Sequence, residues 1–255
     1  MLCGREPGDG GAFPLRSPLA AHAVLRLSQK FDPIALVEGK RGFMIEASAS
    51  PTTALPSPPP ALRLLNERPA IDIAAAERAV SDLLTALGQD PTGEHLRGTP
   101  RRVAAAYVEL LSPRPFNLTT FPNDEGYNEL VLARDIPFHS LCQHHLLPFK
   151  GVAHVGYLPG QRILGLSKLA RVVELFARGL QVQERLTVQI ADWLQQHLAP
   201  QGVGVVLVAE HLCMTLRGAK SSGSQTVTSA LQGLVRDDPR TRAEFLALAT
   251  GSSRS

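Results

Sequence analysis

Residues 129–159 read ELVLARDIPFHSLCQHHLLPFKGVAHVGYLP, two β-type segments on either side of a Cys/His-rich bend. Residues 129–141 and 151–159 are rich in Val, Leu, Ile and Phe, and they partly alternate apolar with polar positions, which is typical of strands. We therefore predict two antiparallel strands, joined by a functional bend over residues 142–150.

Two helices are predicted after this strand pair, over residues 167–179 and 182–198. In the second helix Leu186, Ile190, Trp193 and Leu194 share one face. Residues 202–217 and 224–235 then predict another pair of strands, and residues 238–250 a short final helix. This order predicts an α+β fold, with helices on one face of an antiparallel sheet.

Upstream of residue 129 the sequence predicts two further helices. The first follows Asp72 as its cap and ends at Gly88, and the second begins at the Thr99-Pro100 pair. Residues 1–66 are rich in Pro, Ala, Gly and Ser and predict a flexible extension, with translation from Met44 as an alternative. Residues 67–255 are then the catalytic domain.

The composition favours a soluble, cytoplasmic protein. Lys and Arg total 26 against 23 acidic residues, a net charge of +3, which is too small a bias to indicate a nucleic-acid or membrane partner. The three cysteines, Cys3, Cys142 and Cys213, cannot form a disulfide framework. No apolar run approaches the ~20 residues that a membrane span needs, and the N-terminus does not resemble a secretory signal.

Cys142, His145 and Cys213 are candidate ligands of a metal ion, since two thiolates and an imidazole suit zinc. Three protein ligands leave a position open for water, whereas a buried apolar role for the cysteines is the alternative. If residues 209–218 are extended, His211, Cys213 and Arg217 face the same side. The sequence leaves His144 open as a fourth ligand or a proton carrier.

Two helix starts carry candidate groups for an anionic purine. Ser167 is predicted as a helix N-cap, with Lys168 and Arg171 following, where backbone N–H groups favour an anion. Gln183 and Glu184 open the next helix, and a Glu can accept two N–H bonds from guanine. An ordinary amphipathic helix and a favourable acid in a first turn are the alternatives.

Four segments together resemble the GTP cyclohydrolase I family: SLCQHHLLPFKGVAHVGYLP, GLSKLARVVELFA, QVQERLT and AEHLCMTLRG. The likeness extends from about Ile71 to Leu248. It implies a tunnelling fold whose subunits form a barrel-like homodecamer of two pentamers, with active sites at subunit interfaces. The implied reaction converts GTP and water to 7,8-dihydroneopterin triphosphate and formate, the first step toward folate or other pterins.

The resemblance also implies a role for each matching residue. Zinc would be held by Cys142, His145 and Cys213, and would activate the water that opens the purine at C8. Proton transfer and the later rearrangement would fall to His144, His211 and Ser167. The triphosphate and the guanine would be bound by Lys168, Arg171, Arg217, Gln183 and Glu184, with Arg101 or Arg102 reaching a neighbouring subunit.

The chain departs from the family pattern at three places. Gln143 stands where Glu is usual beside the zinc cysteine, Gly179-Leu180 where Arg-Pro is common, and Gly98 where Asp is common. These departures keep open a weakly active paralogue that binds GTP or a pterin as a regulatory subunit. A related tunnelling-fold enzyme with another purine or pterin substrate, and a purely structural zinc protein, are further alternatives.

Overall fold

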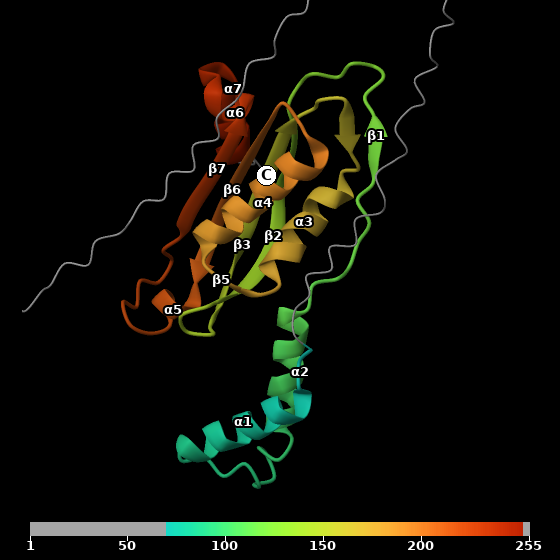
Figure 1. Ribbon diagram of the computed structural model, residues 1–255. Helices are drawn as coiled ribbons and strands as arrows, with labels where there is room; N and C mark the ends of the chain where they lie inside the picture. The colour runs from blue at the N-terminus through green and yellow to red at the C-terminus, as the bar shows by residue number, and fades with distance from the viewer. Residues whose placement is uncertain (1–69, 252–255) are drawn as a thin grey trace, which may run out of the picture. The chain divides into compact units, whose positions relative to one another are not determined.

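A five-stranded sheet in the order β5-β2-β3-β6-β7 organises the protein, in a computed structural model that describes residues 70–251 (Figure 1). Neighbouring strands are antiparallel except for β2 and β5, which pair in parallel over two residues. The strands are β2 (Val131–Cys142), β3 (Pro148–Leu158), β5 (Leu180–Gln181), β6 (Gly202–His211) and β7 (Thr226–Gly233). Both predicted strand pairs are therefore confirmed, and so is the α+β class.

Helices α3 (Ser167–Ala177) and α4 (Gln183–Leu198) cover one face of this sheet, as Figure 1 shows. The predicted apolar face of α4 is confirmed, because Leu186, Ile190, Trp193 and Leu194 are all buried. They pack against alternate residues of β6, including Val205. This layer forms the larger hydrophobic core and fixes where α4 begins relative to the end of β6.

The C-terminal helices cover part of the opposite face of the sheet, so the prediction of helices on one face only is wrong. Phe245 in α7 (Pro239–Thr250) is fully buried and packs with Val206 of β6, which points away from α4. A Cβ built on Gly204 would lie 2.6 Å from the Phe245 ring. The absence of a side chain there leaves the space that the ring fills, and α6 (Leu234–Asp237) connects β7 to this helix.

A small antiparallel ribbon, which the sequence does not predict, connects the sheet to α3. It pairs β1 (Thr120–Pro122) with β4 (Arg162–Leu164). The Leu164 N–H donates to the Tyr157 hydroxyl at 2.8 Å, which fixes the ribbon to the end of β3. The chain then enters α3 at this same end of the sheet.

Two helices precede the sheet, α1 (Ile73–Ala86) and α2 (Thr99–Leu111). Asp72 caps α1 by accepting from the Ala75 N–H at 2.9 Å, as predicted, and Gly88 follows its end with φ +75°. The N-cap of α2 is Gly98 rather than Thr99, one residue earlier than predicted. Within residues 70–251 no helix is long and apolar enough to cross a membrane. The predicted extension over residues 1–66, with Cys3 and Met44, lies outside the described residues.

Candidate active site

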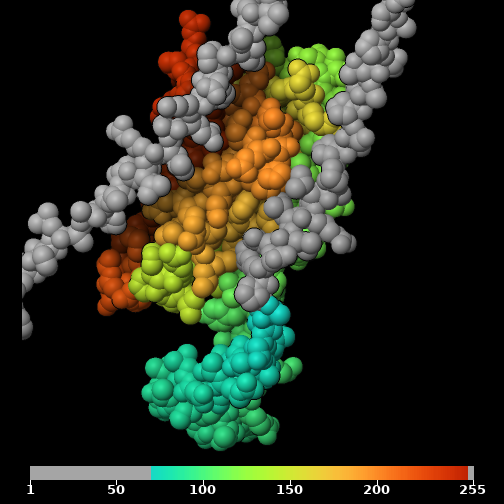
Figure 2. Space-filling view, in the orientation of Figure 1, coloured from blue at the N-terminus to red at the C-terminus, as the bar shows by residue number. Residues whose placement is uncertain are grey.

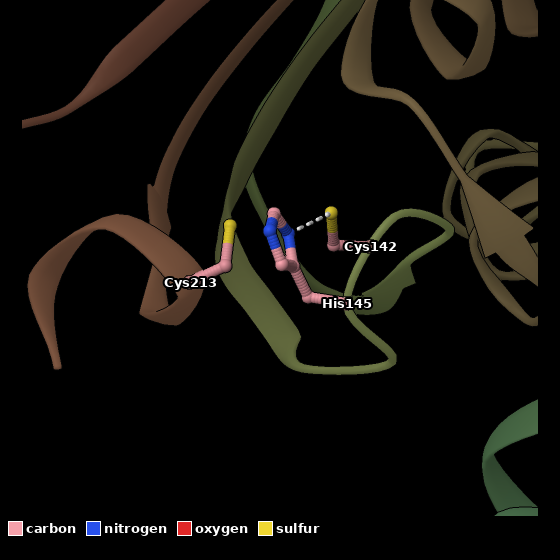
Figure 3. Close-up of side chains that lie close together, drawn as sticks. All are labelled: Cys142, His145 and Cys213. Carbon is pink, nitrogen blue, oxygen red and sulfur yellow. Dashed lines mark hydrogen bonds between the residues drawn. The ribbon is translucent and has the colours of Figure 1, made fainter. Parts of the chain in front are cut away.

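The three predicted metal ligands meet at one end of the sheet. Cys142 ends β2, His145 lies in the bend that follows, and Cys213 lies in the one-turn helix α5 (Leu212–Thr215) after β6. Their ligand atoms all lie within 4.8 Å of one another, and Cys142 Sγ is 3.7 Å from His145 Nδ1. Figure 3 shows the three side chains pointing toward one another. The sheet order explains this meeting, because β2 and β6 both flank β3.

This group could hold a metal ion, and its donor chemistry suits zinc. Bonds of about 2.3 Å to sulfur and 2.0 Å to nitrogen in a tetrahedron separate the ligand atoms by roughly 3.5–3.8 Å. The 3.7 Å between Cys142 Sγ and His145 Nδ1 fits this geometry. Residues 143–146 of the bend are exposed, and Figure 2 shows the yellow-green bend at the surface beside the orange-red segment that includes α5. The bend beside the group is therefore open to solvent.

The expected extension of the strand beyond His211 is wrong. β3 starts at Pro148 and pairs no further than Phe149 with His211, while β7 pairs no further than Thr226 with Ala209. Residues after His211 therefore have no neighbouring strand, and the chain turns into α5. Cys213 consequently reaches the metal group from a helical turn and does not share a strand face with His211 and Arg217.

Arg217 follows α5 and is exposed. Burial raises the pKa of the Cys213 thiol, and the neighbouring Cys142 raises it further. The positive charge of Arg217 acts in the opposite direction. Arg217 thus acts electrostatically on the metal group, although it does not lie on the strand as predicted.

His144 is exposed beside the metal group. Its Nδ1 lies 3.7 Å from Cys142 Sγ, and its ring meets that of His145 nearly edge-on. Among the described residues, the set of mutually close ligand atoms contains Cys142, His145 and Cys213 but not His144. This favours the second of the two roles that the sequence leaves open, that of a proton carrier.

Two side chains from elsewhere in the chain hold the bend. Arg185 of α4 donates to Gln143 Oε1 at 2.9 Å and to the Leu180 carbonyl at 2.7 Å. The Tyr107 hydroxyl of α2 donates to the Leu146 carbonyl at 3.1 Å, and Leu146 has a φ of +55°, which is unfavourable for a residue with a side chain. Gln143, the departure from the family pattern, therefore bonds to a fixed arginine.

His211 lies on the inner face of β6, toward α4. Its ring stacks on Phe149 of β3, with centroids 4.6 Å apart and planes 3° from parallel. Its Nε2 lies 2.7 Å from Gln183 Oε1. Burial lowers the pKa of His211, and the negative charge of Glu184 partly offsets this. The imidazole is thus held in place at the end of the strand that leads to Cys213.

Gln183 and Glu184 begin α4 as predicted, but their surroundings differ. Glu184 is exposed, so its carboxylate is available to a ligand. Gln183 is 1% exposed, and both ends of its amide are already hydrogen-bonded within the protein. The contacts of Gln183 therefore do not favour its predicted role in reading guanine.

Ser167 and Lys168, at the start of α3, lie away from the metal group of the same chain. α3 begins at Ser167 and ends at Ala177, three residues before Leu180 pairs with Leu141 near the metal end of β2. A helix of this length spans about 16 Å, so Ser167 and Lys168 lie roughly that far from the metal end. Ser167 is the first residue of α3 and not its N-cap, which is Leu166.

The other predicted basic residues have partners within the chain. Arg171 forms an ion pair with Glu174 at 3.2 Å on the exposed side of α3. Arg102 donates to the Thr99 hydroxyl at 2.9 Å at the start of α2, and Arg101 is exposed beside it. A phosphate ligand would have to compete with Glu174 for Arg171.

The sequence did not identify Phe149, Arg185 or Tyr107 as parts of this site. Phe149 and Arg185 lie inside the segments that carry the family resemblance; Arg185 directly follows Glu184, and Phe149 lies four residues after His145. Tyr107 had no such signal, because its contact with Leu146 joins positions 39 residues apart.

Comparisons with known proteins agree with this geometry. The family model for GTP cyclohydrolase I matches residues 76–250. GTP cyclohydrolase 1 of Aquifex aeolicus is 52% identical over 182 residues, covering 71% of this chain and 99% of that protein. GTP cyclohydrolase 1 of Deinococcus radiodurans is 46% identical over 211 residues, covering 81% of this chain and 95% of that protein. The chain belongs to the GTP cyclohydrolase I family.

Proposed function

We propose that this chain converts GTP and water to 7,8-dihydroneopterin triphosphate and formate, the first step of folate or other pterin biosynthesis. The observation that carries the proposal is the group of Cys142, His145 and Cys213, whose ligand atoms lie within 4.8 Å of one another beside an exposed bend. Three ligands leave room for a water, which is the pattern of catalytic zinc sites. Zn²⁺ bound there supplies a water whose pKa is lowered to about 7.

The two histidines beside the metal group would move protons. His144 is exposed and adjacent to the ligand His145, so it can reach the ring nitrogens of a purine held over the bend. His211 is stacked on Phe149, at the end of the strand that leads to Cys213. An imidazole is the side chain best suited to proton transfer near neutral pH.

Glu184 would read the guanine base. Its exposed carboxylate lies in the first turn of α4, and it can accept hydrogen bonds from the N1 and 2-amino groups together. Ser167, Lys168, Arg171 and Arg217 would serve the later rearrangement and the triphosphate. Lys and Arg side chains at a helix start favour a phosphate.

The active site would be completed by a second copy of the chain. Ser167 and Lys168 lie roughly a helix length, about 16 Å, from the metal end of their own subunit. The sheet also has open edges within the described residues: β7 pairs only with β6, and β2 pairs with β5 only at its last two residues. These open edges are available for pairing between copies, and we therefore propose a tunnelling-type homo-oligomer, a decamer of two pentamers with sites at subunit interfaces.

The activity is tested by incubating the metal-loaded protein with GTP. Formate release and a pterin that fluoresces after oxidation are expected, with metal content measured on the same sample. GTP binding without formate would favour the regulatory paralogue, which Gln143 keeps open. Substitution Glu184→Ala should abolish the preference for GTP over ITP, and unchanged preference would favour a different purine or pterin substrate.

The role of His144 is tested by His144→Ala. We expect turnover to stop while the zinc content remains at one ion per chain, because His144 is outside the ligand group. Loss of zinc in this variant would instead make His144 a ligand.

The shared site is tested by mixing two inactive variants. Cys213→Ala removes a metal ligand and Lys168→Ala a phosphate-binding group. If the two residues act in one site from different subunits, unfolding and reassembling the variants together restores part of the activity. Mixing that restores nothing, although mixed oligomers form, would place both residues in one chain's site.

A further inference from the structure

Gln183 is buried at the start of α4, and its side-chain amide makes four contacts. Its Nε2 lies 2.9 Å from the Thr226 carbonyl, 3.2 Å from the Leu207 carbonyl and 3.1 Å from Thr228 Oγ1. Its Oε1 lies 2.7 Å from His211 Nε2. The side chain is only 1% exposed, so these contacts and not a ligand determine its orientation.

The carbonyl groups of Leu207 and Thr226 determine which atom of the Gln183 amide is the nitrogen and which is the oxygen. A carbonyl oxygen only accepts hydrogen bonds, so the atom facing Leu207 and Thr226 must be the NH₂ group. Thr187 supports the same assignment. Its hydroxyl donates to the Gln183 main-chain carbonyl at 2.7 Å, and it therefore accepts from Thr228 at 2.6 Å. Thr228 Oγ1 can then accept a hydrogen bond from the Gln183 amide. The two N–H groups of this amide are therefore shared among three acceptors, so that one N–H is bifurcated.

The amide oxygen of Gln183 must therefore face His211. Because this oxygen is only an acceptor, His211 Nε2 has to carry the hydrogen. Neutral imidazole has one N–H, so Nδ1 then keeps its lone pair. Within the described residues Nδ1 of His211 has no hydrogen-bonding partner. The stacked Phe149 ring, 3° from parallel, limits rotation of the imidazole.

We propose that Gln183 is a positioning residue, which holds His211 as the Nε2–H tautomer and leaves the lone pair of Nδ1 available to the substrate. Gln183 then acts through His211 and does not contact the guanine base. The kinetic part of this inference rests on the proposed function, whereas the tautomer is a property of the protein without substrate.

The tautomer is measured by neutron diffraction from crystals of the deuterated protein, at a pH above the ordinary pKa range of an imidazole. We expect deuterium on His211 Nε2 and none on Nδ1. Deuterium on Nδ1 would overturn the proposal, whatever the enzyme does with GTP. The outcome of this measurement therefore does not depend on whether the proposed activity is correct.

The positioning role is measured with Gln183→Met, which keeps the side-chain length and removes the amide. We expect kcat to fall roughly 10- to 100-fold, the range for losing an orienting partner of a functional imidazole. KM for GTP and the preference for GTP over ITP should change less than twofold. A loss of that preference at unchanged kcat would show that Gln183 reads guanine and would overturn the proposal.

Two further variants separate positioning from folding. Gln195→Met changes a glutamine on the same helix whose amide bonds to Pro200, and it should keep the full kcat. Thr228→Val removes one acceptor of the Gln183 amide but leaves the contact with His211, so it should lower kcat in the same direction by less. If Gln183→Met does not fold, a Thr228→Val enzyme with normal stability and unchanged kcat would overturn the proposal.

Discussion

Arg185 should set how tightly the bend binds zinc, and Arg185→Met tests this. The arginine donates to Gln143 Oε1, to Gln181 Oε1 at 2.9 Å and to the Leu180 carbonyl. Methionine keeps much of the aliphatic length and removes every donor. The bend that carries Cys142 and His145 would then lose its bond to α4, while all three metal ligands remain.

The size of the effect follows from these three hydrogen bonds. Each contributes about 0.5–1.5 kcal/mol net, and the exposure of Arg185 favours the lower end. Three bonds at that lower end give about 1.5 kcal/mol for the set. In the variant the bend is less ordered before zinc binds, so zinc binding has to restore its shape. Since 1.4 kcal/mol is a factor of ten in affinity, we expect the zinc affinity to fall about tenfold.

The assay is competition for zinc between the metal-free protein and a chromophoric chelator, together with the melting temperature of each variant. Arg242→Met, on the exposed side of α7, is the matched control and should leave the affinity unchanged. Gln143→Glu keeps an acceptor for Arg185 as an exposed ion pair worth about 0.2–1 kcal/mol. It should change the affinity less than about fivefold. Unchanged zinc affinity in Arg185→Met, with a lower melting temperature, would refute the reasoning.

Two predictions concern the stability of the sheet. Gly204→Ala should lower the free energy of unfolding, measured in urea, by about 1–3 kcal/mol, because its Cβ would lie 2.6 Å from the Phe245 ring. Gly165→Ala is the control, since no atom there is closer than 3.5 Å. Equal losses in the two variants would contradict the packing argument. His154 is buried, its Nδ1 accepts from the Asp135 N–H, and burial lowers its pKa. In the unfolded chain His154 therefore binds a proton near pH 6.5, whereas in the folded protein it binds one only at lower pH. The free energy of unfolding consequently falls as the pH drops below about 6.5. His154→Asn keeps an acceptor for the Asp135 N–H and should reduce the loss of stability between pH 7.5 and 5.5. If the variant loses as much stability as the parent protein, other groups such as His211 cause the loss.

Sequence patterns predicted those parts of the fold that depend on residues close together in the chain. The buried face of α4 follows from helical spacing alone, and the Asp72 cap from local hydrogen bonding. The C-terminal helix was predicted in extent, but its position on the opposite face was not. That position depends on the ring of Phe245 meeting Gly204, a contact between residues 41 positions apart that no local pattern records.

The meeting of Cys142, His145 and Cys213 could be anticipated from the sequence, because two cysteines and a histidine near the ends of predicted strands are the side chains that zinc sites use. The structure of the segment after His211 could not, since its composition suits a strand and only the ends of β3 and β7 stop it from pairing. The role of Gln183 was hidden for the same reason. Its partners Leu207, Thr226 and Thr228 come from two strands that meet only after folding.

The position of β3 between β2, which carries Cys142, and β6, which leads to Cys213, has a consequence for how the chain stays folded. An ion bound by Cys142 and Cys213 would join the end of β2 to the turn that follows β6, across the neighbouring strand β3. It closes a loop of roughly 70 residues, and a covalent cross-link closing such a loop would remove about 4 kcal/mol of unfolded-state entropy. Zinc at this position would therefore act as a cross-link that stabilises the folded sheet, in addition to its role in the reaction. Limited metal supply would then lower the amount of folded protein as well as the activity.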